Sequence, residues 1–408
     1  MAQPPECPPD QFSLIALVKI HQKEREEYRA RIRELEKQLA AWCGAKHSVS
    51  CANGTDALAL PLMAWGLKPG DAVFCPSFTF VATAQVVPWL GAAPVFVDIL
   101  PDTYNMDPAH LRQQIEAVKA EVMNCRTNVG ISEISNFAKY EIVGPGAREW
   151  LSNVMANFIP QPGRLALTPM CNENGKIIGD FTICGAGSDG GDGERFQMFG
   201  SSQAQIYHMR WFEAHLPEDG SVLIRNLDLG LTGLSIAGPN AQLVLAKLSD
   251  EDLSNESFKF MDYKEMVVAR VPAMINRISY TGDLGYEIWM KVDYLRYVFD
   301  LLMEAGAEFG VKPFGLRALN ALRLEKNWSS WAREYRPIYG PYAANLGRFV
   351  GTRKNDFIGR DAAMRERDAG PELKLVALKV AATDADVIGD EPVWIDGKVM
   401  GWITSGGF

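Results

Sequence analysis

The pattern of apolar segments changes near residue 120, and this change constrains the fold more than any other feature of the sequence. Before it, short apolar runs at 48–51, 72–76 and 94–99 alternate with helical patterns at 55–66 and 80–90. Strands that alternate with helices are typical of βαβ units and a parallel sheet. The sequence therefore predicts an α/β fragment at its N-terminal end.

After the change, strand-like and helical segments follow one another without regular alternation. The strand-like segments are 140–143, 176–183, 195–199 and 274–280, and the helical ones include 146–156, 203–215 and 294–306. This mixture predicts an α+β region. From residue 372 the sequence LKLVALKV, followed by PVWIDGKVMGWITSGGF, predicts antiparallel strands with a hairpin turn at Asp396-Gly397. We expect three parts: residues 1–121, 122–371 and 372–408.

Composition excludes several classes of protein. A chain of 408 residues and 45.1 kDa is long enough for two or three domains with buried cores. A net charge of −9 and a pI near 5.3 give no general attraction for nucleic acid or anionic membranes. No stretch approaches the length of apolar residues that spans a bilayer. We therefore predict a cytoplasmic protein, or a mitochondrial matrix protein in a eukaryote, with no nucleic-acid or membrane partner.

The seven cysteines are scattered and form no C-x-x-C pair. They indicate a reducing compartment and no zinc or redox motif. His208 and His215 lie seven residues apart on a helical stretch without a second pair, so we expect core or surface histidines and no metal site.

Residues 13–42 form a helical pattern with one apolar stripe. Tyr28, Ile32, Leu35, Leu39 and Trp42 follow one another at spacings of 4, 3, 4 and 3. The stripe fits a helix that binds a partner or a second copy, and it also fits a helix that packs on its own domain. Two heptads are short for a coiled coil, which favours the second interpretation.

The segment CANGTDAL at residues 51–58 runs from a predicted strand into a helix start. Its backbone N–H groups and the Thr55 hydroxyl could face an anion, although Asn-Gly-Thr is also a plain turn with a helix N-cap. With LKPGDAVFCPSFTFVATA (67–84) and GAAPVFVDILPDTYNMDPAHL (91–111), the region from about residue 30 to 120 resembles the DegT/StrS-type sugar aminotransferases, which use pyridoxal phosphate.

That resemblance implies that Gly54 and Thr55 hold the cofactor phosphate and that Phe80 stacks on its ring. The family also needs an acidic residue at the pyridine nitrogen and a Schiff-base lysine, both later in its chain. The resemblance ends before either, and Lys119 and Lys139 lie in other contexts. We therefore expect a truncated domain that does not carry out transamination by itself.

A second resemblance covers residues 129–408. It rests on eight segments, which occur in family order: ISEISNFAKYEIVGPGAREWL, RLALTPMCNENGKIIGDFTI, YHMRWFEAHLP, GLSIAGP, RISYTGDLGYEIW, FGLRALNALRLEKNWSSWAREY, KNDFIGRDAA and VIGDEPVWIDGKVMGWITSGG. They resemble the aminomethyltransferase family, the glycine-cleavage T-protein, and within it the folate-binding C-terminal half of dimethylglycine and sarcosine dehydrogenases. The fold implied is a set of α+β domains around a central folate-binding hole, followed by a β-barrel that is truncated here.

Two motifs supply candidate tetrahydrofolate contacts. A pterin presents adjacent N–H donors that a buried carboxylate can accept in pairs. Glu287 in the motif GYEI matches the family's pterin-binding glutamate, with Tyr286 beside it, and Arg323 in LRLE matches an arginine near the folate. Alternatively, Glu287 forms a cross-strand pair and Arg323 is an ordinary partner for Glu325 or Glu334.

Asp180, in the segment KIIGDFT, is the candidate catalytic residue. The one-carbon unit arrives as an electrophilic iminium or aminomethyl carbon, and a carboxylate near the reacting nitrogens would stabilise the cation and take up a proton. Asp180 matches the family's catalytic aspartate. Gly179 precedes it where T-proteins carry two adjacent acids, which favours the dehydrogenase branch. A solvated hairpin aspartate is the alternative.

The run GAGSDG at residues 185–190 satisfies G-x-G-x-x-G. A dinucleotide site needs a helix after the glycines, whereas a strand-like segment follows here. We interpret the run as a hairpin loop. The dehydrogenases that this region resembles bind FAD through a separate domain.

The predicted function is transfer of a one-carbon unit from a small-molecule donor to tetrahydrofolate, which gives 5,10-methylene-tetrahydrofolate. One alternative is a dimethylglycine- or sarcosine-dehydrogenase relative whose oxidation step is supplied by an FAD subunit in trans. Another is a non-catalytic folate binder or an inactive fusion.

Overall fold

The computed structural model describes residues 11–407 apart from 69–70, 189–192, 382–386 and 388; for residues 11–25 and Leu229 it describes the backbone alone. The chain divides into two compact units, residues 1–112 and 113–408.

The first unit contains helices α1 (Gln11–Cys43), α2 (Gly54–Ala64) and α3 (Ala82–Trp89) and strands β1 (Ala72–Pro76) and β2 (Ala93–Val97). The two strands pair in parallel, with Ala72 opposite Ala93, and α3 connects them. Ala59, Cys75, Val86, Val87 and Ala92 form the small core. The segment 48–51, expected to be a strand, has no strand structure, because no described segment pairs with it.

Asn53 caps helix α2, since its side-chain oxygen accepts a hydrogen bond from the N–H of Asp56 at 2.9 Å. Gly54 and Thr55 therefore lie in the first turn of a capped helix. The Phe80 side chain is exposed.

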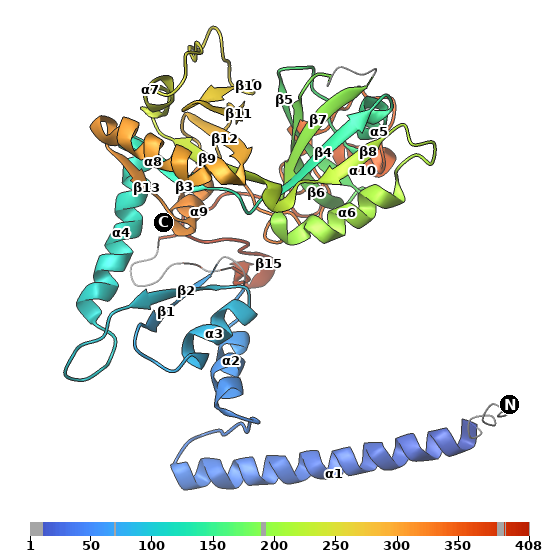
Figure 1. Ribbon diagram of the computed structural model, residues 1–408. Helices are drawn as coiled ribbons and strands as arrows, with labels where there is room; N and C mark the ends of the chain where they lie inside the picture. Colours follow the sequence, from blue (N-terminus) through green and yellow to red (C-terminus); the bar gives the residue numbers. More distant parts are fainter. Residues whose placement is uncertain (1–10, 69–70, 189–192, 382–386, 388, 408) are drawn as a thin grey trace, which may run out of the picture. The chain divides into compact units, whose positions relative to one another are not determined.

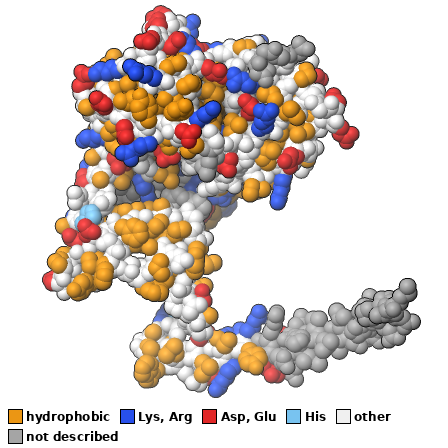
Figure 2. Space-filling view, in the orientation of Figure 1, with side chains coloured by type: hydrophobic (Ala, Val, Ile, Leu, Met, Phe, Trp, Pro, Cys, Tyr) orange, Lys and Arg blue, Asp and Glu red, His pale blue; other side chains and the backbone are white. Residues whose placement is uncertain are grey.

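The apolar stripe of α1 is exposed throughout its described part. Tyr28 is 71% and Trp42 85% exposed, and Ile32, Leu35 and Leu39 are close to half exposed. Figure 2 shows hydrophobic side chains on the surface of this helix.

The second unit begins within helix α4 (Pro108–Thr127) and contains two sheets that lie next to each other in Figure 1. The first sheet has six strands in the spatial order β10-β11-β12-β9-β3-β13. Their bounds are β3 (Val129–Glu133), β9 (Leu231–Ala237), β10 (Tyr263–Val268), β11 (Val271–Asn276), β12 (Gly285–Lys291) and β13 (Val311–Pro313). All neighbouring pairs are antiparallel except β13 and β3.

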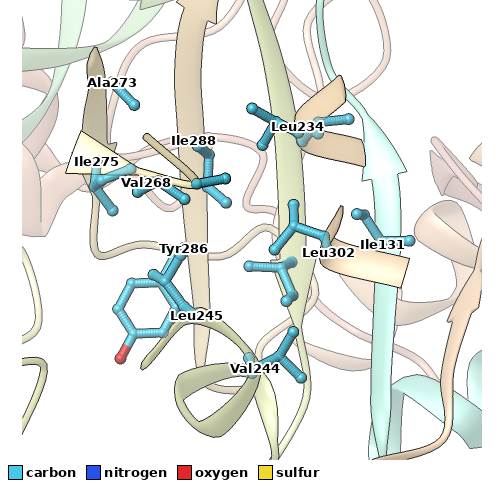
Figure 3. Packing of buried hydrophobic residues seen from close by; sticks show 14 of the residues in the cluster. Ile131, Leu234, Val244, Leu245, Val268, Ala273, Ile275, Tyr286, Ile288 and Leu302 are labelled. Carbon is cyan, nitrogen blue, oxygen red and sulfur yellow. The ribbon is translucent and has the colours of Figure 1, made fainter. Parts of the chain in front are cut away.

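Helices α7 (Ala241–Ala246) and α8 (Leu295–Gly306) pack on one face of this sheet. Alternate strand residues such as Ile131, Leu234 and Ile288 meet Leu245 and Leu302 of the helices in one buried cluster (Figure 3). Because side chains alternate between the faces of a strand, the residues between them point to the other face. That face is turned toward the functional cavity described below.

The second sheet has five strands in the order β5-β6-β7-β4-β8. They are β4 (Ala138–Gly144), β5 (Leu165–Cys171), β6 (Ile177–Gly185), β7 (Glu194–Gly200) and β8 (Leu223–Asn226), and all pairings are antiparallel. Helices α5 (Ala147–Val154) and α6 (Gln205–Ala214) contribute Leu151 and Phe212 to its core. The glycine run after β6 leads to β7, although residues 189–190 of that run lie outside the described residues.

A third cluster of apolar residues joins the two sheets. Phe199 of β7 stacks on Trp289 of β12 with ring centroids 4.4 Å apart, and Cys184 and Leu231 belong to the same cluster. The two sheets are therefore packed through side chains that point away from their helices.

The remaining elements are helices α9 (Leu316–Glu325) and α10 (Arg360–Ala369) and the hairpin of β14 (Pro392–Ile395) and β15 (Lys398–Trp402). Asp396 and Gly397 in the turn have φ values of 49° and 75°, as a two-residue hairpin with this dipeptide requires. The described residues after 371 form this two-stranded sheet and no closed barrel, and 372–380 has no strand structure.

Candidate functional site

A cavity of about 900 Å³ lies in the second unit and is lined from both sheets. Asp180 and Thr182 of β6 line it together with Glu287 and Trp289 of β12. The two candidate carboxylates, which are 107 positions apart in the sequence, therefore face one space. The loop of residues 328–331 forms a further part of the wall.

Asp180 reaches the cavity because β6 alternates. Phe181 and Ile183 point into the core with α5 and α6, so Asp180 and Thr182 point the other way. Among the described residues no other side chain or backbone group forms a hydrogen bond with the Asp180 carboxyl. Burial without such partners raises the pKa of Asp180 to about 7, against an ordinary value of 3.8.

Glu287 lies in the middle of β12, paired with Asn276 on one side and Ser235 on the other. Its Oε2 accepts hydrogen bonds from Asn276 Nδ2 at 3.2 Å and from Trp289 Nε1 at 3.3 Å. Burial raises the pKa of Glu287 to about 7, although these two donors oppose the shift. The two hydrogen bonds fix the orientation of this carboxyl, because both end on the same oxygen.

The cavity wall also includes several aromatic residues and two cations, Lys326 and Arg348. Tyr280 donates a hydrogen bond from its hydroxyl to the backbone oxygen of Ser329 at 2.6 Å. Lys326 Nζ lies 5.4 Å and the Arg348 guanidinium 5.6 Å from the ring centre of Trp328. Sequence reasoning missed these wall residues. The segment KNWSSW, which follows LRLE directly, is the signal that could have found Lys326 and Trp328.

The structure places Arg323 outside this cavity. Its Nη1 lies 3.1 Å from Glu334 Oε2, with each side chain about 4% exposed. Its Nη2 donates to Ser405 Oγ at 2.7 Å, and that hydroxyl donates to Glu334 Oε1 at 2.5 Å. Arg323 and Glu334 line a second cavity of about 540 Å³ beside the C-terminal segment. The geometry corresponds to the alternative in which Arg323 is the partner of Glu334.

Tyr286 also lies apart from the cavity. It is fully buried on the opposite face of β12 from Glu287, in the core with α7 and α8 (Figure 3). Its ring stacks on Phe258 with centroids 5.9 Å apart. Neighbouring residues of one strand point to opposite faces, so this strand cannot bring both side chains to one ligand.

Metal ligation has no support among the residues that the structure describes, where no three His, Cys, Asp or Glu side chains converge. His208 is buried and bonds to a backbone oxygen, and His215 bonds to the oxygen of Trp211. In the same described part of the chain, no helix combines the length and apolarity needed to cross a bilayer.

Comparison with known proteins identifies the family. Residues 94–354 match the family described as GCVT N-terminal domain. The chain belongs to this family. Residues 14–140 also match the DegT/DnrJ/EryC1/StrS aminotransferase family. Both resemblances seen in the sequence are confirmed.

Two curated relatives and one solved structure illustrate the GCVT relationship. Human mitochondrial dimethylglycine dehydrogenase is 36% identical over 295 residues, which are 72% of this chain and 34% of that protein. An aminomethyltransferase of Natranaerobius thermophilus is 30% identical over 302 residues, covering 73% of this chain and 80% of that protein. The structure of the glycine cleavage system aminomethyltransferase T from Bartonella henselae has a TM-score of 0.62 at 24% identity, covering 71% of this chain and 77% of that one.

These comparisons fix the fold of the GCVT region as T-protein-like. The chain spans about a third of the length of the dimethylglycine dehydrogenases that it matches. The chain therefore belongs to the aminomethyltransferase family.

Proposed function

We propose that this GCVT-family protein transfers a one-carbon unit from an iminium or aminomethyl donor to tetrahydrofolate, giving 5,10-methylene-tetrahydrofolate. The observation that carries the proposal is that Asp180 and Glu287 line the same cavity. Burial raises the pKa of each carboxyl to about 7. A residue that must gain or lose a proton near neutral pH works best with a pKa in that range.

Glu287 is the pterin anchor in this proposal. Two neighbouring side chains hold one of its oxygens, and among the described residues none donates to the other, Oε1. A pterin N–H donor can take that remaining acceptor, and the aromatic wall of Trp289 and Trp328 provides apolar surface for a flat ring.

Asp180 is the catalytic carboxylate. Among the described residues it accepts a hydrogen bond from its own backbone N–H and from no other residue, which leaves acceptor capacity for the substrate. When ionised, it stabilises the positive charge of the iminium, and once the first folate nitrogen has attacked the carbon, it takes up the proton released. It can return this proton to the donor's amine, which leaves as the second folate nitrogen bonds to the same carbon and closes the methylene bridge. Because Asp180 is largely desolvated in the cavity, this electrostatic effect is stronger than at an exposed surface.

A second candidate for the donor follows from the 36% identity with dimethylglycine dehydrogenase. In this version the iminium is formed by oxidation of an N-methyl amino acid on an FAD subunit and then reaches the Asp180 cavity. Co-purification with a yellow protein, and methylene-tetrahydrofolate formation that depends on it, would favour this donor over an aminomethyl carrier.

Binding and chemistry can be tested separately with two isosteric variants. In Glu287→Gln an amide N–H donor replaces a carboxylate oxygen that accepts from the pterin, so two donors face each other. Tetrahydrofolate should therefore bind about 1 to 3 kcal/mol more weakly. Asp180→Asn should bind tetrahydrofolate nearly as wild type does and transfer the one-carbon unit about a hundredfold more slowly. Calorimetric titration measures the affinity, and a coupled assay for methylene-tetrahydrofolate measures the transfer.

Absence of tetrahydrofolate binding by the wild-type protein would remove the proposal and favour an inactive fusion. Tight binding without transfer, for free and partner-supplied donors alike, would indicate a non-catalytic folate binder. An Asp180→Asn variant that reacts at the wild-type rate would remove the catalytic assignment alone.

A further inference from the structure

Strand β6 is irregular two residues before Asp180. The pairing with β5 passes from Met170 opposite Gly179 directly to Cys171 opposite Ile177. Ile178 is therefore the extra residue of a β-bulge and has no partner on β5. A bulge bends its strand and redirects the side chains that follow it, and bulges are frequent next to functional sites.

The backbone oxygen of Ile178 bonds to a buried histidine instead. His208 of α6 is fully buried, and its Nε2 lies 2.8 Å from that oxygen. Burial lowers the pKa of His208 to about 4, so the ring is neutral at neutral pH. A carbonyl oxygen only accepts, so the ring hydrogen must be on Nε2. The other nitrogen, Nδ1, is buried without a hydrogen-bond partner among the described residues.

The ring of His208 also packs against two aromatic residues that line the cavity. It packs edge-on against Phe181 at 4.8 Å and Trp331 at 5.4 Å between ring centres. Phe181 follows Asp180 directly, and Trp331 belongs to the wall loop. A single buried ring thus contacts the residue that follows Asp180 and an aromatic residue of the loop that lines the same cavity.

The lack of a side chain at Gly179 allows the His208 ring to lie close to the backbone of β6. A Cβ added at Gly179 would lie 2.9 Å from His208 Nε2 and 2.5 Å from a ring carbon of Phe181. Atoms at such distances must move apart, so any larger residue at 179 would push the imidazole from the Ile178 oxygen. This contact gives a physical reason why glycine, and not a second acid, precedes Asp180 in this chain.

We propose that His208, as a neutral imidazole with its hydrogen on Nε2, is a positioning residue that holds the β6 bulge and thereby aims Asp180 into the cavity. This inference rests on the proposed function, because it concerns the geometry of the same carboxylate. His208 touches no substrate atom in this scheme and acts through the backbone of Ile178 and the rings of Phe181 and Trp331.

The test compares three variants for transfer rate and tetrahydrofolate affinity. His208→Phe keeps an aromatic ring and removes the donor, so kcat should fall about 10- to 100-fold through misplacement of Asp180, while the tetrahydrofolate Kd stays within about twofold. His208→Gln can again donate to Ile178 and should recover most of the rate. His215→Phe is the matched control from the end of the same helix and should leave kcat unchanged.

If His208 had only a structural role, its replacement would lower the amount of folded protein and would not lower kcat selectively at an unchanged Kd. Circular dichroism and urea unfolding therefore accompany each assay. If His208→Phe does not fold, Gly179→Ala is the second variant, and it should lower kcat in the same way by displacing the ring. Nitrogen-15 NMR of the wild-type imidazoles adds a readout without activity, in which His208 should show the Nε2–H tautomer.

A His208→Phe or Gly179→Ala protein with wild-type kcat, or an Nδ1–H tautomer at His208, would overturn the inference while leaving the proposed function intact. A wild-type protein that forms no methylene-tetrahydrofolate with any donor would instead remove the proposed function, and this inference with it.

Discussion

Asp180→Asn should stabilise the folded protein at neutral and alkaline pH while it impairs the reaction. The carboxyl is buried without donors from other residues, so its ionised form is unfavourable in the folded state. A pKa that rises from 3.8 to about 7 corresponds to about 4 kcal/mol, at about 1.4 kcal/mol for each pH unit. Water that enters the cavity reduces this figure, and we expect a gain of about 1 to 3 kcal/mol in the free energy of unfolding at pH 8.

The pH dependence identifies the cause of this gain. Because the folded-state pKa of Asp180 lies above its unfolded value, the folded protein binds the additional proton between about pH 4 and pH 7. The wild-type free energy of unfolding loses this contribution as the pH rises through that window. The difference between variant and wild type should therefore be near zero at about pH 4, grow up to about pH 7 and stay constant above it.

Urea unfolding of both proteins at several pH values between about 5 and 8 measures this difference. Other titrating groups contribute equally to both proteins and cancel. Asp180→Glu keeps a carboxyl at the site and serves as the control without the gain. A difference that is the same at pH 5 and pH 8, or a less stable Asp180→Asn protein at pH 8, would refute the reasoning.

Two further predictions concern Arg323 and the first unit. Arg323→Met leaves Glu334 buried without its cation, so the free energy of unfolding in urea should fall by about 3 to 5 kcal/mol. The tetrahydrofolate affinity of the folded variant should stay at the wild-type value. A large loss of affinity in a stable variant would instead make Arg323 a folate contact. Borohydride reduction in the presence of pyridoxal phosphate should fix no cofactor on any lysine, because the aminotransferase resemblance ends before that family's lysine; stoichiometric labelling in the mass spectrum would contradict this.

The sequence predicted elements well where local pattern and tertiary pairing agree. The run at 72–76 is a strand with the predicted bounds, because β2 is a neighbour that completes its hydrogen bonds. The similar apolar run at 372–380 has no strand structure, since among the described segments it forms no strand ladder, and its backbone contact is the hydrogen bond from the Leu375 N–H to the Ala343 oxygen. An isolated strand has unpaired backbone groups, so periodicity alone is not sufficient to form it.

In the candidate site, the local sequence pattern likewise places some side chains, whereas others depend on contacts with residues far away in the sequence. Alternation along β6 and β12 predicts that Asp180 and Glu287 point away from the helices, and the family motifs mark both residues. The same alternation should have separated Tyr286 from Glu287. The position of Arg323 could not be read from its motif, because its direction depends on Glu334 and Ser405, which lie 11 and 82 positions away.

The two carboxyls also differ in a way that assigns their roles. Burial raises the pKa of each carboxyl to about 7, and both line the cavity to which Phe199 and Trp289 also contribute. Glu287 has two donors on one oxygen, so its direction is set before any ligand arrives. Among the described residues, no neighbouring side chain donates to Asp180, and the backbone that carries it has a bulge two residues earlier. A fixed acceptor suits recognition of a rigid ring, whereas a carboxyl that no neighbouring side chain holds suits a proton that must move during the reaction.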